Sequence, residues 1–291
     1  MKRVILTVLA LSLLFLLTSC NRKQESASSN LPRVSATPDY LRSFGVAPTT
    51  EKGTCFAFVI YFPSAKPAGK VTPIPFFSFD EGKLQTVALQ RLMMGMDSVP
   101  AYRGEFLQPF PPGTRLLGVG LRGTTVTVNF SKEIATVERD PRAAEALVTA
   151  VVLTLKQFEK VRQVRLTVDG SLDALDTLVG HADASAVMAP SAPRLLSVTA
   201  AKEKGAKNAE EINAYFDRPV EIKALRMAGA DGKPFQGELF QSVFDMAGVL
   251  KPKDPALFVK GMPVEVHWEV ADKLGRKASG DQEVPLEWME H

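Results

Sequence analysis

Residues 147–170 read LVTAVVLTLKQFEKVRQVRLTVDG, and this stretch decides how the first half of the chain folds. Its first part repeats apolar residues at helical spacing as far as Phe158, which is the period of an amphipathic helix. Its second part, VRLTVDG, alternates apolar and polar residues, as a half-buried strand does. We therefore predict a helix that begins at Asp140-Pro141, a typical N-cap and first-turn pair, and leads directly into a strand.

Four cations, Lys156, Lys160, Arg162 and Arg165, crowd into this corner. Such a run is compatible with binding an anionic polymer, but local structure explains most of it. Lys156 and Lys160 are one turn apart at the end of the predicted helix, where cations favour the carbonyl end of the helix dipole. Arg165 alternates with the valines and is expected on the opposite face of the strand. Arg162 and Arg165 remain as candidate contacts for a partner.

The rest of the first half completes a pattern around this corner. A β-type run, CFAFVIYF, is followed by a helical run, GKLQTVALQRLMMG, that stops at Gly95. Two further runs, RLLGVGL and TTVTVNF, meet at Arg122-Gly123 as a β-hairpin. The predicted order of elements is β-α-β-β-α-β.

These landmarks resemble the GerMN domain of bacterial sporulation and spore-germination lipoproteins. The resemblance rests on VIYFPS, LQRLMMG, PPGTRLLGVGLRGTTVTVNFSKEI and the stretch quoted above. It implies a small mixed α/β domain over residues 53–180, in which two helices cover one face of a single sheet. Some members of the family resemble ring-building modules of secretion and sporulation machines, so self-association is one expected mode of action. The insert VTPIPFFSFDEG departs from the family pattern and leaves the sheet edge there undefined.

The first twenty residues, MKRVILTVLALSLLFLLTSC, have the composition of an export signal. Lys2 and Arg3 precede an apolar run that is too short for a permanent membrane span. The ending LTSC resembles the lipobox of bacterial lipoproteins. The resemblance implies that residues 1–19 are removed and that Cys20 is diacylated, with palmitate among the acyl chains, so that membrane lipid anchors the protein. The other interpretation is an ordinary secretory signal in which Cys20 is incidental.

Two further composition changes divide the chain. Residues 20–52 are rich in Ser, Pro and Thr and predict a flexible tether, and residues 181–193, HADASAVMAPSAP, predict a linker. In residues 194–291, short β-type runs alternate with turn sequences such as ADGKP and KPKDP, which predicts an all-β sandwich. YFDRPVEIKALRM and VHWEVADKLGRKASG resemble bacterial Ig-like modules through a Phe-x-x-Pro-Val turn and an Asp-x-x-Gly turn. The expected class of the whole chain is α+β.

Charge and cysteine content narrow the function. The formal charge is +3, and removal of Lys2 and Arg3 would leave about +1. A nucleic-acid binder needs a concentrated positive face, so we expect no nucleic-acid partner. Cys20 and Cys55 are the two cysteines, so lipidation of the first leaves no intramolecular disulfide. Cys55 heads an apolar strand and is expected to be a buried thiol.

No reactive motif stands out in the sequence. The histidines, His181, His267 and His291, lie in the linker, in a predicted strand and at the last residue, without metal-ligand spacing. Asp169, Asp173 and Asp176 lack the ligand order of a calcium loop, and a turn followed by a solvated helical turn is favoured there. We therefore expect no catalytic residue, no metal site and no cofactor.

The expected protein is a lipid-anchored lipoprotein of the cell envelope that faces the periplasm or the cell exterior and acts by binding. In the leading hypothesis its GerMN-like surface contacts another envelope protein, or copies of itself, in an assembly role. The alternative is an accessory lipoprotein that binds peptidoglycan or assists wall remodelling, because arginines and lysines of the first domain can meet the carboxylates of the wall.

Overall fold

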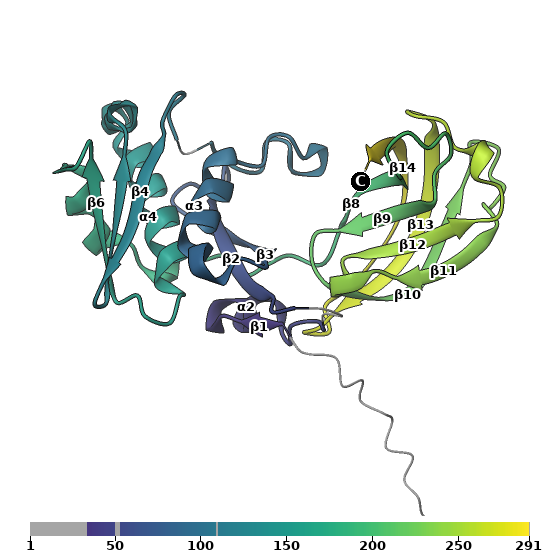
Figure 1. The fold of residues 1–291 in the computed structure, drawn as a ribbon, viewed down its shortest axis with the longest axis horizontal. Helices are drawn as coiled ribbons and strands as arrows, with labels where there is room; N and C mark the ends of the chain where they lie inside the picture. Colours follow the sequence, from purple (N-terminus) through teal and green to yellow (C-terminus); the bar gives the residue numbers. More distant parts are fainter. Residues whose placement is uncertain (1–33, 50–52, 109, 291) are drawn as a thin grey trace, which may run out of the picture. The chain divides into compact units, whose positions relative to one another are not determined.

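The computed structural model describes residues 34–49, 53–108 and 110–290. The predicted signal peptide, Cys20 and the first part of the predicted tether lie outside the described residues. The described residues belong to one compact unit, in which an α/β region is followed by a sheet-rich region (Figure 1). Among these residues, no helix has the length and apolarity needed to cross a membrane.

Strand β2 (Phe56–Pro63) is the centre of a three-stranded sheet with the order β1-β2-β3. The insert that departs from the family pattern forms β3 (Val71–Ser78), which pairs antiparallel with β2. Its two prolines, Pro73 and Pro75, are two residues apart in an edge strand, so the positions without an N–H group lie on the same side of the strand. The insert therefore adds a strand between β2 and α3, so the predicted order β-α-β-β-α-β is wrong at this point.

The predicted tether does not hold for residues 34–49. They form β1 (Ser35–Ala36), which pairs parallel with the start of β2, and helix α2 (Pro38–Phe44). Tyr40 and Phe44, one helical turn apart, are buried in a core cluster with alternate residues of β2. Burying two aromatic side chains offsets the entropy that a flexible tether would keep.

A second sheet carries the predicted hairpin and the helix-to-strand corner. Its order is β4-β5-β6-β7, with β4 and β5 antiparallel and β5 and β6 parallel. The turn at Asp169-Gly170 is confirmed, and both residues have positive φ (46° and 82°), as a tight hairpin turn requires. The strands are β4 (Leu116–Arg122), β5 (Thr125–Phe130), β6 (Gln163–Val168) and β7 (Ser171–Leu172).

Both predicted helices are confirmed: α3 (Leu84–Met94), which ends at Gly95, and α4 (Pro141–Lys156), whose N-cap is Asp140. A short α5 (Leu175–Leu178) follows β7. The main core joins α3, α4 and the inner faces of β2, β5 and β6. Two sheets are therefore present where a single sheet was expected.

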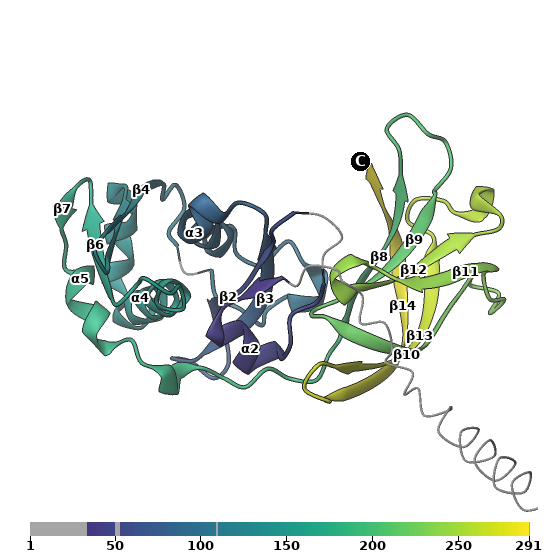
Figure 2. The ribbon, with the colours of Figure 1, turned by 60° about the horizontal axis from the view of Figure 1, so that its bottom comes forward.

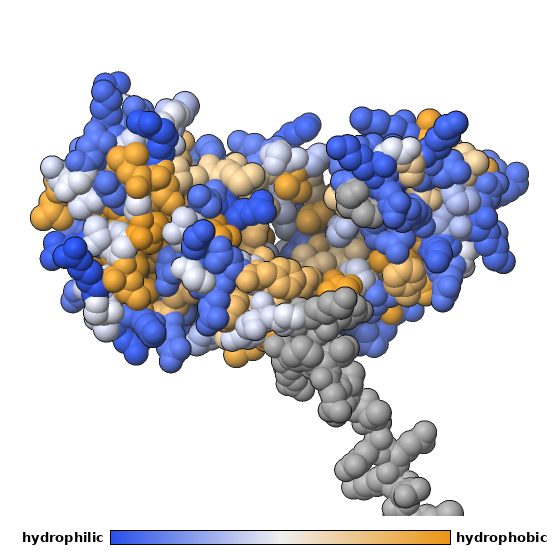
Figure 3. All heavy atoms as spheres, in the orientation of Figure 1, coloured by the Kyte–Doolittle hydropathy of each residue, from blue (hydrophilic) through white to orange (hydrophobic). Residues whose placement is uncertain are grey.

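The outer edge of the second sheet is β4, and much of it is exposed. Leu117 and Leu121 are 45% and 39% exposed, and Figure 3 shows apolar residues over the part of the molecule where β4 lies in Figure 1. The backbone edge of β4 that faces away from β5 has no strand partner among the described residues.

The sheet-rich region has seven strands in the order β10-β13-β14-β8-β9-β12-β11. The last part of β14 leaves β13 and pairs parallel with β8, so the strand belongs to both halves of the sheet. The halves face each other across a core: a Cβ added at Gly248 would lie 2.2 Å from Leu225 and 2.8 Å from Ile222. The strands are β8 (Leu195–Lys202), β9 (Glu211–Phe216), β10 (Val220–Ala228), β11 (Gly237–Gln241), β12 (Ala247–Pro252), β13 (Pro263–Asp272) and β14 (Lys277–Glu290).

These strands confirm a sheet-rich region after residue 194, while an Ig-like topology stays a prediction. The predicted linker contacts the first region, since Met188 donates its backbone N–H to the carbonyl of Val71 (2.8 Å).

Candidate functional site

A groove of about 830 Å³ lies at the helix-to-strand corner of the α/β region. Its walls come from β1 and the start of α2, from β2, from the start of α3, and from the end of α4; Figure 2 shows α2, α3, α4 and β2 in this region. Phe58, Leu84, Leu121 and Phe158 make its lining partly apolar.

Charges of both signs line the same groove. Lys156, Lys160 and Arg162 belong to the cationic run of the sequence, and three carboxylates lie among the other lining residues: Asp39, Glu81 and Glu159. Because the signs balance, the groove does not have the field of a polyanion site. A lining that combines apolar residues with charges of both signs is instead compatible with a protein-binding surface.

The structure does not bring the two candidate arginines together. Arg162 lines the groove, and its backbone N–H bonds to the carbonyl of Thr124 (2.8 Å). Arg165 alternates with the buried Val164 and Leu166, so it lies on the opposite face of the sheet, and its Nη1 is 3.2 Å from the Asp176 carboxylate. Arg162 is thus placed at the groove, whereas Arg165 is engaged within the domain.

Gln157 is a residue of the groove that the sequence reasoning missed. Its Oε1 accepts hydrogen bonds from Val59 N–H and from the Thr37 hydroxyl (both 2.9 Å). Its Nε2 donates to the carbonyls of Val59 (2.6 Å) and Thr154 (2.7 Å). The side-chain amide is therefore satisfied internally and supports the groove without being available to a ligand. The available signal was a polar residue between the apolar positions Leu155 and Phe158.

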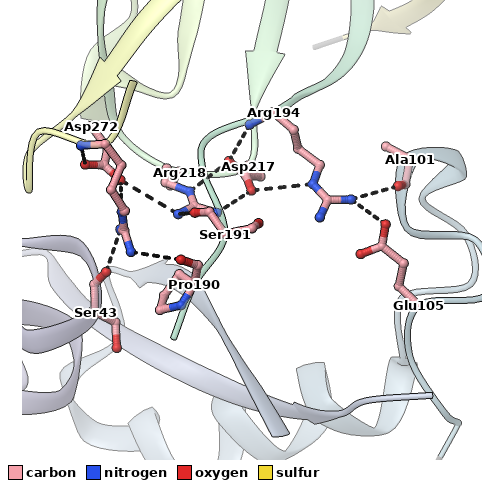
Figure 4. A network of polar contacts seen from close by, with 10 residues as sticks. Ser43, Ala101, Glu105, Pro190, Ser191, Arg194, Asp217, Arg218 and Asp272 are labelled. Carbon is pink, nitrogen blue, oxygen red and sulfur yellow. Dashed lines mark hydrogen bonds and ion pairs between the residues drawn. The ribbon is translucent and has the colours of Figure 1, made fainter. Parts of the chain in front are cut away.

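Beyond the groove, a buried charged network connects two turns of the sheet-rich region (Figure 4). Arg218 makes a bidentate contact with Asp217, with distances of 2.9 Å and 2.7 Å, and lies 3.7 Å from Asp272. The side chains of these three residues are 3% (Asp217), 4% (Arg218) and 1% (Asp272) exposed. Arg276 pairs with Asp272 from the other side. The network uses the two turns on which the Ig-like resemblance rested.

The same arginines bond to backbone carbonyls outside the sheet. Arg276 donates to Ser43 at the end of α2 (2.8 Å) and to Pro190 (3.2 Å), while Arg218 donates to Ser191 (2.6 Å). Arg194 donates to the Ala101 carbonyl (3.3 Å) and pairs with a nearby carboxylate, Glu105 (Figure 4). The network therefore holds the sheet-rich region against α2, the linker and the loop after α3.

Side chains that could bind a metal or react chemically are dispersed over the described residues. Across residues 34–49, 53–108 and 110–290, no group of three or more His, Cys, Asp or Glu side chains could hold a metal ion. Cys55 is buried, and burial raises the pKa of its thiol. His267 lies in β13 as predicted, and its Nδ1 is 2.8 Å from the exposed Asp281 carboxylate.

Residues 59–173 match the Germane family, whose description is sporulation and spore germination. Among solved structures, the first GerMN domain of the sporulation protein GerM from Bacillus subtilis is similar to 40% of this chain, with 20% identity, a TM-score of 0.34 and 85% of that chain covered. The tandem GerMN domains of the same protein match with 17% identity and a TM-score of 0.34, over 55% of this chain and 58% of that one.

PcoC, a methionine-rich copper resistance protein from Escherichia coli, matches 33% of this chain and all of its own, with 16% identity and a TM-score of 0.23. No curated protein matches this chain. Since the TM-scores are low, the assignment rests on the family match. That match runs from β2 to just beyond β7 and includes Phe158 and Arg162 at the groove. The chain therefore contains a Germane domain, also called a GerMN domain, over residues 59–173.

Proposed function

We propose that this protein is a lipid-anchored lipoprotein of the cell envelope that binds another envelope protein through the groove of its Germane domain, without catalysis. The observation that carries the proposal is the groove itself, whose lining combines the exposed Leu121 and the buried rings of Phe58 and Phe158 with three cations and three carboxylates. Such a surface suits a protein partner, because its apolar lining can contact apolar side chains while its charged residues form ion pairs.

The proposed anchor places the groove near the membrane. Residues 20–33 separate the lipidated Cys20 from Val34, and the groove lining begins at Ser35. Fourteen residues span at most about 50 Å when fully extended. The partner is therefore expected at the membrane surface or within that distance of it.

Site-specific photo-crosslinking in cells tests the groove. A photoreactive residue at Lys160, on the groove, should capture a defined neighbour, whereas one at Lys233, which is 84% exposed in the sheet-rich region, should not. Reversing the groove charges with Lys160→Glu and Arg162→Glu should weaken the capture. The matched control is Lys251→Glu with Lys253→Glu, two exposed lysines of the sheet-rich region. Equal capture by both charge-reversed variants would contradict the proposal.

Two further measurements test the alternative and the anchor. Retention on purified peptidoglycan that is lost in high salt would support the wall-binding alternative. The anchor is tested by Cys20→Ser, which should release the protein from membranes; membrane retention of this variant would contradict lipidation. The sporulation role of GerM belongs to that protein and is not part of this proposal.

A further inference from the structure

Strand β4 contains a sequence that reads the same in both directions. Residues 117–121 are Leu-Gly-Val-Gly-Leu, centred on Val119, and they lie at the edge of the second sheet that no other described strand pairs with. An antiparallel neighbour runs in the opposite direction, so a second copy would present the same residues in the same order. We propose that two copies of this chain pair antiparallel through their β4 edges, about a two-fold axis at Val119.

The backbone geometry supports pairing at this residue. The hairpin closes on the pair Arg122 and Thr125 with two residues in the turn. Such a terminal pair is hydrogen bonded, and residues along an antiparallel strand then alternate in the direction of their N–H and C=O groups. Val119 and Leu121 consequently turn these groups away from β5, towards the open edge. In the two-fold pair, each Val119 bonds to Val119 of the second copy, and each Leu121 lies opposite Leu117.

The side chains leave room for this pairing. A Cβ added at Gly118 or Gly120 would meet nothing within 4 Å, so the outer face of the strand is open. The exposed Leu117 and Leu121 would cover each other across the axis. Residues 116–121 contain no proline or charged residue, which are the usual means of blocking an exposed edge.

Two features limit the pairing, and the second makes it depend on salt concentration. The register shift between Leu116 and Gly118 makes Leu117 an extra residue, so the regular part of the ladder is short. In the pair, Arg122 lies near Arg115 of the second copy, and like charges at such positions oppose association. Salt screens that repulsion, so the dimer should strengthen as ionic strength rises. Partner binding that depends on ion pairs at the groove would instead weaken as ionic strength rises.

The test is the oligomeric state of the full chain in detergent, measured by sedimentation equilibrium at rising concentration and at low and high salt. We expect a monomer–dimer equilibrium that high salt favours. Val119→Pro removes an N–H group that faces the open edge, where proline is tolerated. Since the two copies lose one hydrogen bond each at the axis, the dimer Kd should rise about 30-fold.

A second variant decides the case if Val119→Pro does not fold. Gly118→Lys with Gly120→Lys places lysines opposite each other on the open face and should abolish the dimer. Thr127→Lys, one strand inward and in register with Gly120, is the control and should still dimerise. A wild-type monomer at all concentrations, or a dimer that survives these edge variants, would overturn the proposal. Leu121 belongs both to the groove and to this edge, but the two proposals are distinguishable, because capture of a different protein at Lys160 would persist in a monomer.

Discussion

The side-chain amide of Gln157 bonds to both backbone groups of Val59: Val59 N–H donates to Oε1 (2.9 Å), and Nε2 donates to the Val59 carbonyl (2.6 Å). Thr154, one turn earlier, accepts a hydrogen bond from Tyr61 N–H (3.1 Å). These are the bonds that a neighbouring strand would make. Two side chains of the α4 segment therefore bond to β2 beyond its short pairing with β1, in place of a further strand.

Gln157→Ala should destabilise the protein strongly. It leaves a buried donor and acceptor of Val59 without partners, which corresponds to about 2–4 kcal/mol of unfolding free energy. Urea denaturation measures the loss. The control is Gln163→Ala, because Gln163 is exposed on β6 and its removal should change stability by less than about 0.5 kcal/mol. Equal effects of the two variants would contradict the role of Gln157 at the β2 edge.

Arg218→Met should lower the free energy of unfolding by about 3–5 kcal/mol, because it leaves the buried carboxylates of Asp217 and Asp272 without their central cation. Lys233→Met removes a cation from the exposed pair with Asp231 and should have an effect below about 1 kcal/mol. Thermal and urea unfolding measure both. A loss below about 1 kcal/mol for Arg218→Met would show that the network does not hold the region in place.

At position 244, substitution by glycine should give a more stable protein than substitution by alanine, which is the reverse of the usual order. Its φ is 66°, which is unfavourable for any residue with a Cβ, and its ring stacks on Phe77 of β3 at 4.8 Å. Phe244→Ala and Phe244→Gly both lose the stacking, but glycine also relieves the backbone strain. Phe244→Gly should therefore be more stable than Phe244→Ala by about 1 kcal/mol in urea unfolding. The opposite order would argue against backbone strain at this position.

Alkaline pH should destabilise the folded protein, because three of its tyrosines are buried. Burial raises the pKa of Tyr40, Tyr61 and Tyr102, and for Tyr61 the hydrogen bond to Asp39 adds to the effect. These pKa values are higher in the folded protein than in the unfolded chain. The stability that the neutral tyrosines contribute is therefore complete below about pH 10 and is lost as pH rises above it.

Ultraviolet absorbance of tyrosinate measures this behaviour. The folded protein should show little ionisation near pH 10, while the urea-unfolded chain, as control, should titrate there. Full ionisation of these three tyrosines at pH 10 in a protein that remains folded would contradict the prediction.

The local sequence pattern was sufficient to predict much of the α/β region. The helix that starts at Asp140, the stop at Gly95 and the turn at Asp169-Gly170 all depend on neighbouring residues, and all three are confirmed. The tether prediction failed over residues 34–49, because it rested on the Ser-, Pro- and Thr-rich composition. It did not use the helical spacing of Tyr40 and Phe44, which are both buried in α2.

The candidate site was predicted only in part. The cationic run located the corner, and Arg162 lies on the groove, but periodicity carried no information about the other walls. Those walls come from segments distant in the chain, such as Leu84 and Leu121. The ion pair of Arg165 with Asp176 likewise depends on where α5 returns to β6.

The sequence by itself predicted β2, α3, β4, β5, α4 and β6, together with the Germane resemblance, because each depends on residues within a few positions of one another. It did not predict β1, α2 or β3, which the structure adds around β2. The tertiary structure decided what bonds to β2 beyond the short β1, since Gln157 reaches Val59 from 98 residues away. It also decided the groove and the charged network around Arg218. A buried polar group must find a partner, and which partner it finds depends on packing that local sequence does not encode.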